Sequence, residues 1–102
     1  MKVHMATDHA GYDMKEHLKV FIEGLGYEVV DHGAKTFDEN DDYVPYIRAA
    51  AQAVAADSEG SLGIVLGGSG QGEAMVANRE KGVRCALFYT PALVPGAADA
   101  EG

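Results

Sequence analysis

Short apolar runs separated by polar and glycine-rich stretches predict four strands along the chain. The runs are KVHMAT (residues 2–7), YEVVDHG (27–33), SLGIVLGG (61–68) and VRCALFY (83–89). The third run is almost wholly apolar, as expected of a central strand in a parallel sheet covered on both faces. The polar, acidic stretch AKTFDENDD (34–42) predicts a loop.

Helical periodicity occupies the intervals between these strands. Residues 11–24 repeat apolar side chains at helical spacing, namely Met14, Leu18, Phe21 and Ile22. Residues 43–57 are alanine-rich and predict a second helix that starts near its proline, and a third is expected over about 72–79. Strands that alternate with helices predict βαβ units, and therefore an α/β fold with a parallel sheet between two helical layers.

Composition narrows the class of protein. The 102 residues suffice for one domain, expected over 1–89, and the proline-containing stretch 90–102 is expected to be an irregular tail. The net charge of -8, without a basic stripe, argues against nucleic-acid binding but is compatible with a pocket for an anionic sugar phosphate. The single cysteine, Cys85, excludes an internal disulfide and favours a cytoplasmic location. No apolar stretch predicts a membrane span or a signal peptide.

The segment GGSGQGE (67–73) follows the third predicted strand and opens the third helix. Strand, glycine turn and helix is the geometry that gathers backbone N–H groups around an anion. Gly67 and Gly72 have the glycine spacing of a phosphate-binding P-loop. Glu73, however, replaces the lysine of that motif, and Ala74 replaces its magnesium-binding hydroxyl. The dinucleotide fingerprint is absent as well, so both nucleotide-binding interpretations fail.

The same loop suits an anion that forms during a reaction, beside the base that creates it. The Ser69 hydroxyl and the amides of Gly70, Gln71 and Gly72 would stabilise the oxyanion. Glu73 would remove the proton whose loss generates it, as in proton abstraction next to a carbonyl that gives an enediolate. A tight strand-to-helix turn with an acid favoured by the helix dipole has the same pattern, and the residues alone leave both interpretations open.

Other candidates lie at the same predicted edge of the sheet. Asp8 and His9 end the first strand, where open α/β sheets bind ligands. Asp8 is slightly more typical of a helix cap, and His9 suits contact with a sugar oxygen or a phosphate. Tyr43, at a helix start, would otherwise be an ordinary surface tyrosine. The histidines have no metal-ligand spacing, and Cys85 is expected to be a core thiol.

Five segments, in this order, resemble the ribose-5-phosphate isomerase B family, which also includes the subunits of galactose-6-phosphate isomerase. They are TDHAGYDMKEHL, GYEVVDHG, DDYVPY, GIVLGGSGQGEAMVANR and GVRCAL, and the resemblance runs to about residue 89. GGSGQGE resembles the branch of the family that uses glutamate as base, whereas another branch has a cysteine at the position of Gly68. The resemblance implies a Rossmann-like α/β/α sandwich with four strands here and five in a complete member.

The resemblance also implies an activity and roles for single residues. Glu73 would shuttle a proton between C2 and C1 while ribose 5-phosphate and ribulose 5-phosphate interconvert, with Ser69 assisting at the enediolate and neither metal nor organic cofactor required. The residues implied to bind the substrate are Asp8, His9, Tyr43, Gly68, Gly70, Gln71 and Gly72. The alternatives are an isomerase of another sugar phosphate, such as a hexose 6-phosphate, or a catalytically inactive anion-binding relative.

Members of this family form homodimers, sometimes dimers of dimers, and the same assembly is expected here, with a phosphorylated sugar as substrate and neither nucleic acid nor membrane as partner. They continue past this point with a helix bearing a REHN-like motif, a fifth strand and further helices. Those parts supply a histidine for ring opening and arginines for the phosphate. Nothing in residues 90–102 resembles them.

Overall fold

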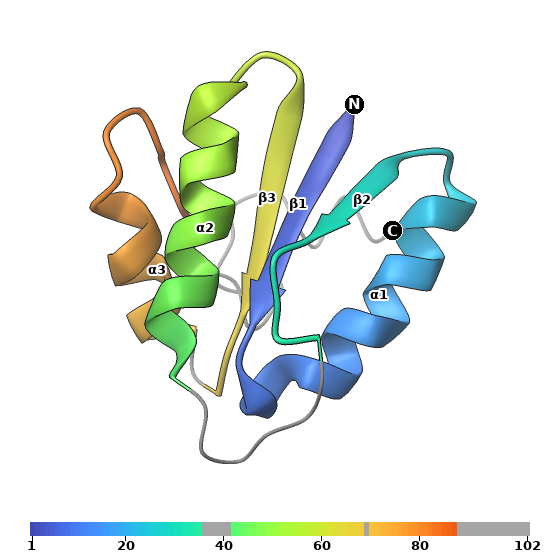
Figure 1. The fold of residues 1–102 in the computed structure, drawn as a ribbon, viewed down its shortest axis with the longest axis horizontal. Helices are drawn as coiled ribbons and strands as arrows, with labels where there is room; N and C mark the ends of the chain where they lie inside the picture. The colour runs from blue at the N-terminus through green and yellow to red at the C-terminus, as the bar shows by residue number, and fades with distance from the viewer. Residues whose placement is uncertain (36–41, 69, 88–102) are drawn as a thin grey trace, which may run out of the picture.

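The computed structural model describes residues 1–35, 42–68 and 70–87. They form one parallel sheet of three strands in the order β2-β1-β3, with helices in the connections (Figure 1). The strands are β1 (Lys2–Thr7), β2 (Glu28–Asp31) and β3 (Ser61–Leu66). The helices are the 3₁₀ turn η1 (His9–Gly11), α1 (Tyr12–Gly24), α2 (Tyr43–Ala56) and α3 (Gln71–Asn78). The predicted α/β fold and its three helices are confirmed. The run expected to be a central strand, β3, instead lies at one edge of the described sheet, and β1 lies at its centre.

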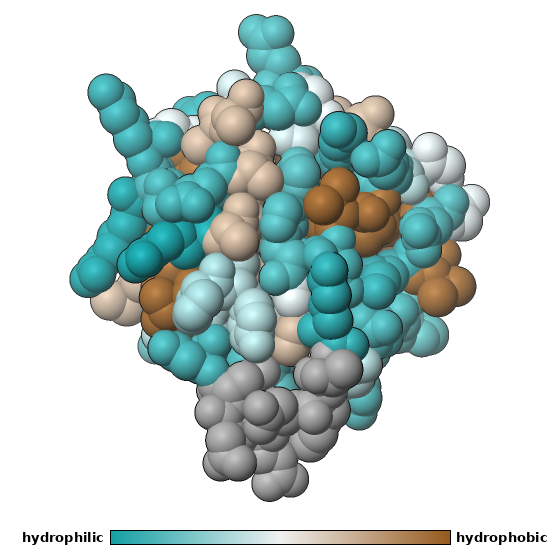
Figure 2. All heavy atoms as spheres, in the orientation of Figure 1, coloured by the Kyte–Doolittle hydropathy of each residue, from teal (hydrophilic) through white to brown (hydrophobic). Residues whose placement is uncertain are grey.

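The two faces of the sheet pack against different helices. Alternation along β1 turns Val3 and Met5 towards Ile22 of α1, while Ala6 packs with Ile47 of α2. Small residues let α2 approach the sheet closely, and the buried ones on this face are Ala50, Ala51 and, from α3, Ala77. The alanine-rich stretch of the sequence therefore covers the chain's own sheet. The surface that faces the viewer in Figure 1 is mostly hydrophilic, with a few separate hydrophobic patches (Figure 2).

The predicted helix α1 is present, but it buries a different set of side chains from the one its periodicity suggested. Ile22 is buried as expected, whereas Met14 and Phe21 are more than half exposed, at 56% and 53%. Lys15, a residue rarely buried, is instead fully enclosed. Its ammonium group donates to both carboxylate oxygens of Asp31, at 2.8 and 2.7 Å. This part of α1 is therefore joined to the end of β2 by an ion pair, and not by the apolar packing that the periodicity predicted.

The fourth predicted strand does not form over 83–87, the part of 83–89 that the structure describes. The side chain of Asn78 takes the bonds that a neighbouring strand would have made: its Oδ1 accepts from the Cys85 N–H at 2.8 Å, and its Nδ2 donates to the Cys85 carbonyl at 2.9 Å. Val83 and Cys85 still pack against the α2 side of the core. The apolar pattern therefore reflects the partial burial of alternate residues in this segment, without a hydrogen-bonded ladder. Burial raises the pKa of the half-buried Cys85 thiol.

Strand register brings the two segments that carry candidate site residues, one after β1 and one after β3, to the same edge of the sheet. β1 pairs with β3 from Lys2↔Ser61 to Thr7↔Leu66, so both strands end at the same level. The chain past β2 also stays bonded to β1, because the Thr7 N–H donates to Gly33 O at 2.8 Å and the Ala34 N–H donates to Thr7 O at 2.7 Å. Within the described part of the chain, no helix is long and apolar enough to cross a membrane.

Two histidines form an unpredicted contact between β1 and the end of β2. His4 Nδ1 and His32 Nε2 share a hydrogen bond at 2.8 Å, and His4 is buried. Burial lowers the pKa of His32, and the neighbouring His4 lowers it further. A protonated pair would place two positive charges in direct contact, so the fold favours the neutral ring.

The free energy of unfolding should therefore decrease in mild acid. Between its lowered folded pKa and the ordinary value of 6.5, His32 binds a proton in the unfolded chain but not in the folded one, so stability is complete above about pH 6.5 and is lost as the pH falls below it. Urea unfolding at pH 7.5 and 5.5 measures this change, and His32→Gln should reduce it. The exposed His17 provides the control, since His17→Gln should leave the pH dependence intact; an equal effect of both variants would contradict the assignment.

Candidate active site

Three segments distant in the sequence converge at the carboxyl edge of the sheet, at the bottom of Figure 1. They are the η1 turn after β1, the glycine loop between β3 and α3, and the start of α2. Gly11 shows how closely they pack, because a Cβ added there would lie 2.7 Å from the Leu66 Cβ and would also clash with the Thr7 hydroxyl. Only a residue without a side chain lets the turn sit against the ends of both strands.

Glu73 lies in the first turn of α3 and is only 5% exposed. Its carboxylate folds back against Gly67, where an added Cβ would lie 2.6 Å from Oε2 and closer still to Oε1. In the described part of the chain this carboxylate has neither a hydrogen bond nor an ion pair. A buried carboxylate without a partner is costly, and such groups are concentrated at functional sites.

Gly70 turns the chain into α3. Its φ of 80° is left-handed, and an added Cβ would lie 2.8 Å from Leu87 Cδ1, so both conformation and space require glycine. As the N-cap residue it has no side-chain oxygen to occupy the first amides of the helix. The helix start therefore keeps the anion-binding character predicted from the sequence. Ser69 lies outside the described residues.

Tyr43 begins α2, as predicted, behind an Asp42 cap whose Oδ1 accepts from the Val44 N–H at 3.1 Å. Its hydroxyl reaches the first turn of α3, since a Cβ added to Gly72 would lie 2.7 Å from the Tyr43 oxygen. The structure thus brings Tyr43 to the same helix turn that holds Glu73. Whether it contacts a substrate stays a prediction.

Asp8 caps the η1 turn, which is the structural role considered above for this residue. Its Oδ1 accepts from the Ala10 N–H at 2.9 Å and so closes the η1 turn that contains His9. Both residues are half-buried. The turn lies beside the glycine loop, because a Cβ added to Gly68 would come 4.0 Å from the Ala10 Cβ. Capping and substrate contact are compatible, since a carboxylate has a second oxygen.

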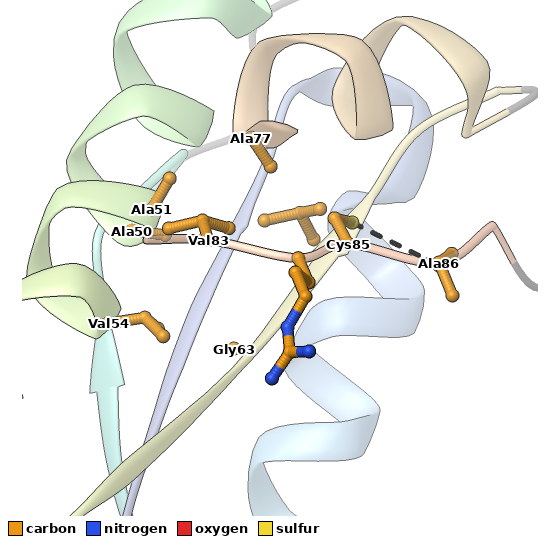
Figure 3. Close-up of a pocket in the computed structure, with 10 residues that line it drawn as sticks. Ala50, Ala51, Val54, Gly63, Ala77, Val83, Cys85 and Ala86 are labelled. Carbon is orange, nitrogen blue, oxygen red and sulfur yellow. Dashed lines mark hydrogen bonds between the residues drawn. The ribbon is translucent and has the colours of Figure 1, made fainter. Parts of the chain in front are cut away.

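Two hollows flank β3, and only one reaches this edge. A hollow of about 590 Å³ runs over the α1 side of β3, between Met14 and Leu18 of α1 and residues 85–86, and ends at Gly67, Gly68 and Gly70. The other, of about 150 Å³, lies on the α2 side and is shown in Figure 3. Its lining is mainly small and apolar and contains no predicted site residue, so it belongs to the packing of the core. The larger of these two is open to the glycine loop, and a third hollow, of about 240 Å³, is lined by Tyr43 and Gly72.

Among the described residues, no group of three or more histidine, cysteine, aspartate or glutamate side chains is placed to hold a metal ion. Sequence reasoning also missed the buried Lys15–Asp31 pair, which lies next to the η1 turn. Burial raises the pKa of the Asp31 carboxyl, but hydrogen bonds from Lys15 and Lys19 outweigh it, and the net pKa lies below the ordinary value. A lone aspartate at the end of an apolar strand was the available signal.

Comparison with known proteins assigns the chain to a family. The model of the Ribose/Galactose Isomerase family matches residues 3–99. The chain belongs to this family. The match extends past residue 89, where the resemblance of the sequence motifs ended.

Individual members of the ribose/galactose isomerase family are similar to this chain in sequence. Ribose-5-phosphate isomerase B of Mycobacterium tuberculosis (strain H37Rv) is 47% identical over 90 residues, which cover 88% of this chain and 55% of that protein. The probable ribose-5-phosphate isomerase B of Mycoplasma genitalium is 38% identical over 88 residues, covering 86% of this chain and 58% of that protein. The chain therefore spans little more than half the length of these curated relatives.

Solved structures confirm the Rossmann-like fold. Ribose-5-phosphate isomerase B of Mycoplasma genitalium with bound ribulose-5-phosphate superposes with a TM-score of 0.86 at 35% identity, over 89% of this chain and 60% of that one. The enzyme of Thermotoga maritima superposes with a TM-score of 0.80 at 38% identity, over 90% and 62%. The order of strands and helices described above is thus that of the family.

The contact between Gly67 and Glu73 predicts a difference between adjacent glycines. Gly67→Ala forces the Glu73 carboxylate, the end of a flexible side chain, out of its buried place, so the carboxylate should become open to modification by a water-soluble carbodiimide. Gly68→Ala meets only the Ala10 Cβ at an ordinary 4.0 Å and should leave Glu73 as protected as in the wild type. Mass spectrometry of the modified protein measures both; equal modification of Glu73 in the two variants would show that it does not occupy this position.

Proposed function

We propose that the protein is an aldose–ketose isomerase that interconverts ribose 5-phosphate and ribulose 5-phosphate through an enediolate, with Glu73 as the base. The observation that carries the proposal is the buried carboxylate of Glu73, which has no partner in the described residues and lies at a glycine-lined helix start. Proton abstraction next to a carbonyl needs a base and an oxyanion site close together, and this edge of the sheet offers both.

The reaction assigns each group a step. Glu73 removes the proton from C2 of the open-chain aldose, and the negative charge moves to O1 as the enediolate forms. The helix-start amides of Gly70 and Gly72, with the Ser69 hydroxyl, stabilise that oxygen. The protonated Glu73 then delivers its proton to C1, while the O2 hydroxyl proton passes to O1. The product is the ketose, and no redox change or external reagent is required.

Substrate contact is assigned to the neighbouring turn and helix start. Asp8 binds the ring oxygen or hydroxyls, His9 faces the phosphate, and Tyr43 lines the pocket beside Gly72. Gly68 and Gln71 complete the loop around the substrate. The choice of a pentose phosphate rests on the relatives, which are named for ribose 5-phosphate, and on the Mycoplasma genitalium structure, which holds ribulose-5-phosphate. Assembly into a homodimer stays a prediction from the family.

Glu73→Gln tests the base directly. The amide keeps the size of the side chain but cannot accept the proton, so kcat should fall by about 10²–10⁴-fold while KM changes little. Isomerisation of ribose 5-phosphate, followed with the intact protein that carries this sequence, measures the loss. Glu59→Gln is the matched control, since Glu59 is exposed and lies just before β3, at the edge of the sheet opposite the glycine loop; its kcat should stay near that of the wild type. Near-normal turnover of Glu73→Gln would remove Glu73 as base.

A non-catalytic sugar-phosphate binder is the second candidate, because a glycine turn at a helix start can bind an anion without any reaction. Solvent deuterium separates the two. An isomerase incorporates deuterium from D₂O at the carbon that Glu73 reprotonates, even when net conversion is slow, whereas a binder leaves the sugar unlabelled. Labelling of a hexose 6-phosphate but not of ribose 5-phosphate would retain the mechanism and change the substrate.

A further inference from the structure

The most unusual side chain in the described structure outside the glycine loop is Lys15, which is completely buried. Its ammonium group donates to both carboxylate oxygens of Asp31, at 2.8 and 2.7 Å, and to the backbone carbonyl of Ala34. Three donors thus meet three acceptors, which uses the whole hydrogen-bonding capacity of the group. The Tyr12 ring lies 5.5 Å from the ammonium and helps to exclude water.

Stability alone explains such a pair poorly. Removing two charges from water costs free energy that their attraction often does not recover, and well-packed apolar replacements are commonly neutral or stabilising. What an ion pair adds is a fixed geometry, because its bonds have defined directions and lengths. The question is then which part of the molecule needs that geometry.

The bonds around Lys15 lead to the η1 turn from both sides. On one side, Lys15 itself lies in the first turns of α1, directly after the turn. On the other, Asp31 Oδ1 accepts from the Gly33 N–H at 2.8 Å, and Gly33 and Ala34 each share a backbone hydrogen bond with Thr7, the residue before Asp8. Lys15 and Asp31 therefore close a ring of contacts around the segment that carries Asp8 and His9.

The same ring extends to the glycine loop. The Thr7 hydroxyl, which is fully buried, donates to the carbonyl of Leu66 at 2.9 Å. Leu66 is the last residue of β3 and precedes Gly67, against which the Glu73 carboxylate rests. Hydrogen bonds through Thr7 thus connect the 31–34 segment with both the η1 turn and the glycine loop.

We propose that Lys15 and Asp31 are positioning residues, which hold the turn bearing Asp8 and His9 at a fixed place relative to the loop bearing Glu73. Neither residue is assigned a contact with the substrate, since Lys15 is fully buried and both carboxylate oxygens of Asp31 bond its ammonium group. The catalytic consequence rests on the isomerase function proposed above, but the structural consequence does not.

Lys19 supplies a matched control within the same helix. It also donates to Asp31, at 2.9 Å, but its side chain is 26% exposed and it bonds no carbonyl of the 33–34 segment in the described residues. Lys15→Met and Lys19→Met each remove one ammonium group from Asp31 and leave the other. Only Lys15→Met also frees the Ala34 carbonyl.

Amide hydrogen exchange measures the positioning without reference to activity. The Thr7 and Ala34 amides bond across the two segments, so both should exchange at least about 10-fold faster in Lys15→Met and at the wild-type rate in Lys19→Met. Amides inside α2 report any general loss of stability, so the acceleration at Thr7 and Ala34 is compared with theirs. Equal exchange in the two variants, or an acceleration in Lys15→Met that is no larger at Thr7 and Ala34 than inside α2, would overturn the proposal.

A double variant separates positioning from stability. Lys15→Met with Asp31→Leu removes both charges, so the melting temperature should return towards that of the wild type. Exchange at Thr7 and Ala34 should stay fast, and kcat/KM for ribose 5-phosphate should stay at least about 10-fold below wild type. Recovery of normal exchange together with stability would overturn the positioning role. A wild-type protein without isomerase activity would instead refute the proposed function and leave the exchange measurement to decide this one.

Discussion

The pairing of β1 with β3, in the register that places Thr7 opposite Leu66, is the constraint on which the rest of the structure depends. Parallel strands in this register end at one level, so the chain leaves both at the same edge of the sheet. The η1 turn and the glycine loop then come together although 59 residues separate Thr7 from Leu66. The Thr7 hydroxyl fixes the junction by bonding the Leu66 carbonyl, and Gly11 lets the turn close over it.

Much of this architecture could be predicted from the sequence, because the strands and helices follow local patterns. Alternation between apolar runs and helical periodicity located β1, β2, β3 and all three α-helices within a few residues. The failures have non-local causes. Asn78 takes the backbone bonds of Cys85, so residues 83–87 pack as expected of a strand without forming one. Periodicity alone could not show that Lys15 is buried, since its partner Asp31 comes from another element.

The candidate site was predictable in its residue types but not in its geometry. Glycine density and the glutamate at 73 indicate a base beside an anion site. The reason for glycine at 67 is the folded-back Glu73 carboxylate, a contact that only the three-dimensional structure provides. Gly70 is required by a left-handed φ and by Leu87, and Gly72 by the Tyr43 hydroxyl. Three glycines that look alike in the sequence are thus required by contacts with three different neighbouring side chains.

The glycines and the buried ion pair meet two different requirements of the proposed catalysis, which are close approach of the substrate and a rigid site. Proton transfer requires the base and the reacting carbon to meet at hydrogen-bond distance, and a loop without side chains lets a substrate approach the backbone that closely. Such a loop has little stiffness of its own, because glycine gains backbone freedom along with space. Here the stiffness comes from its surroundings: Thr7 and the Lys15–Asp31 pair anchor the strand ends with buried, directional bonds. The site can therefore be open at its surface and rigid beneath, which is the combination that a catalyst acting through position requires.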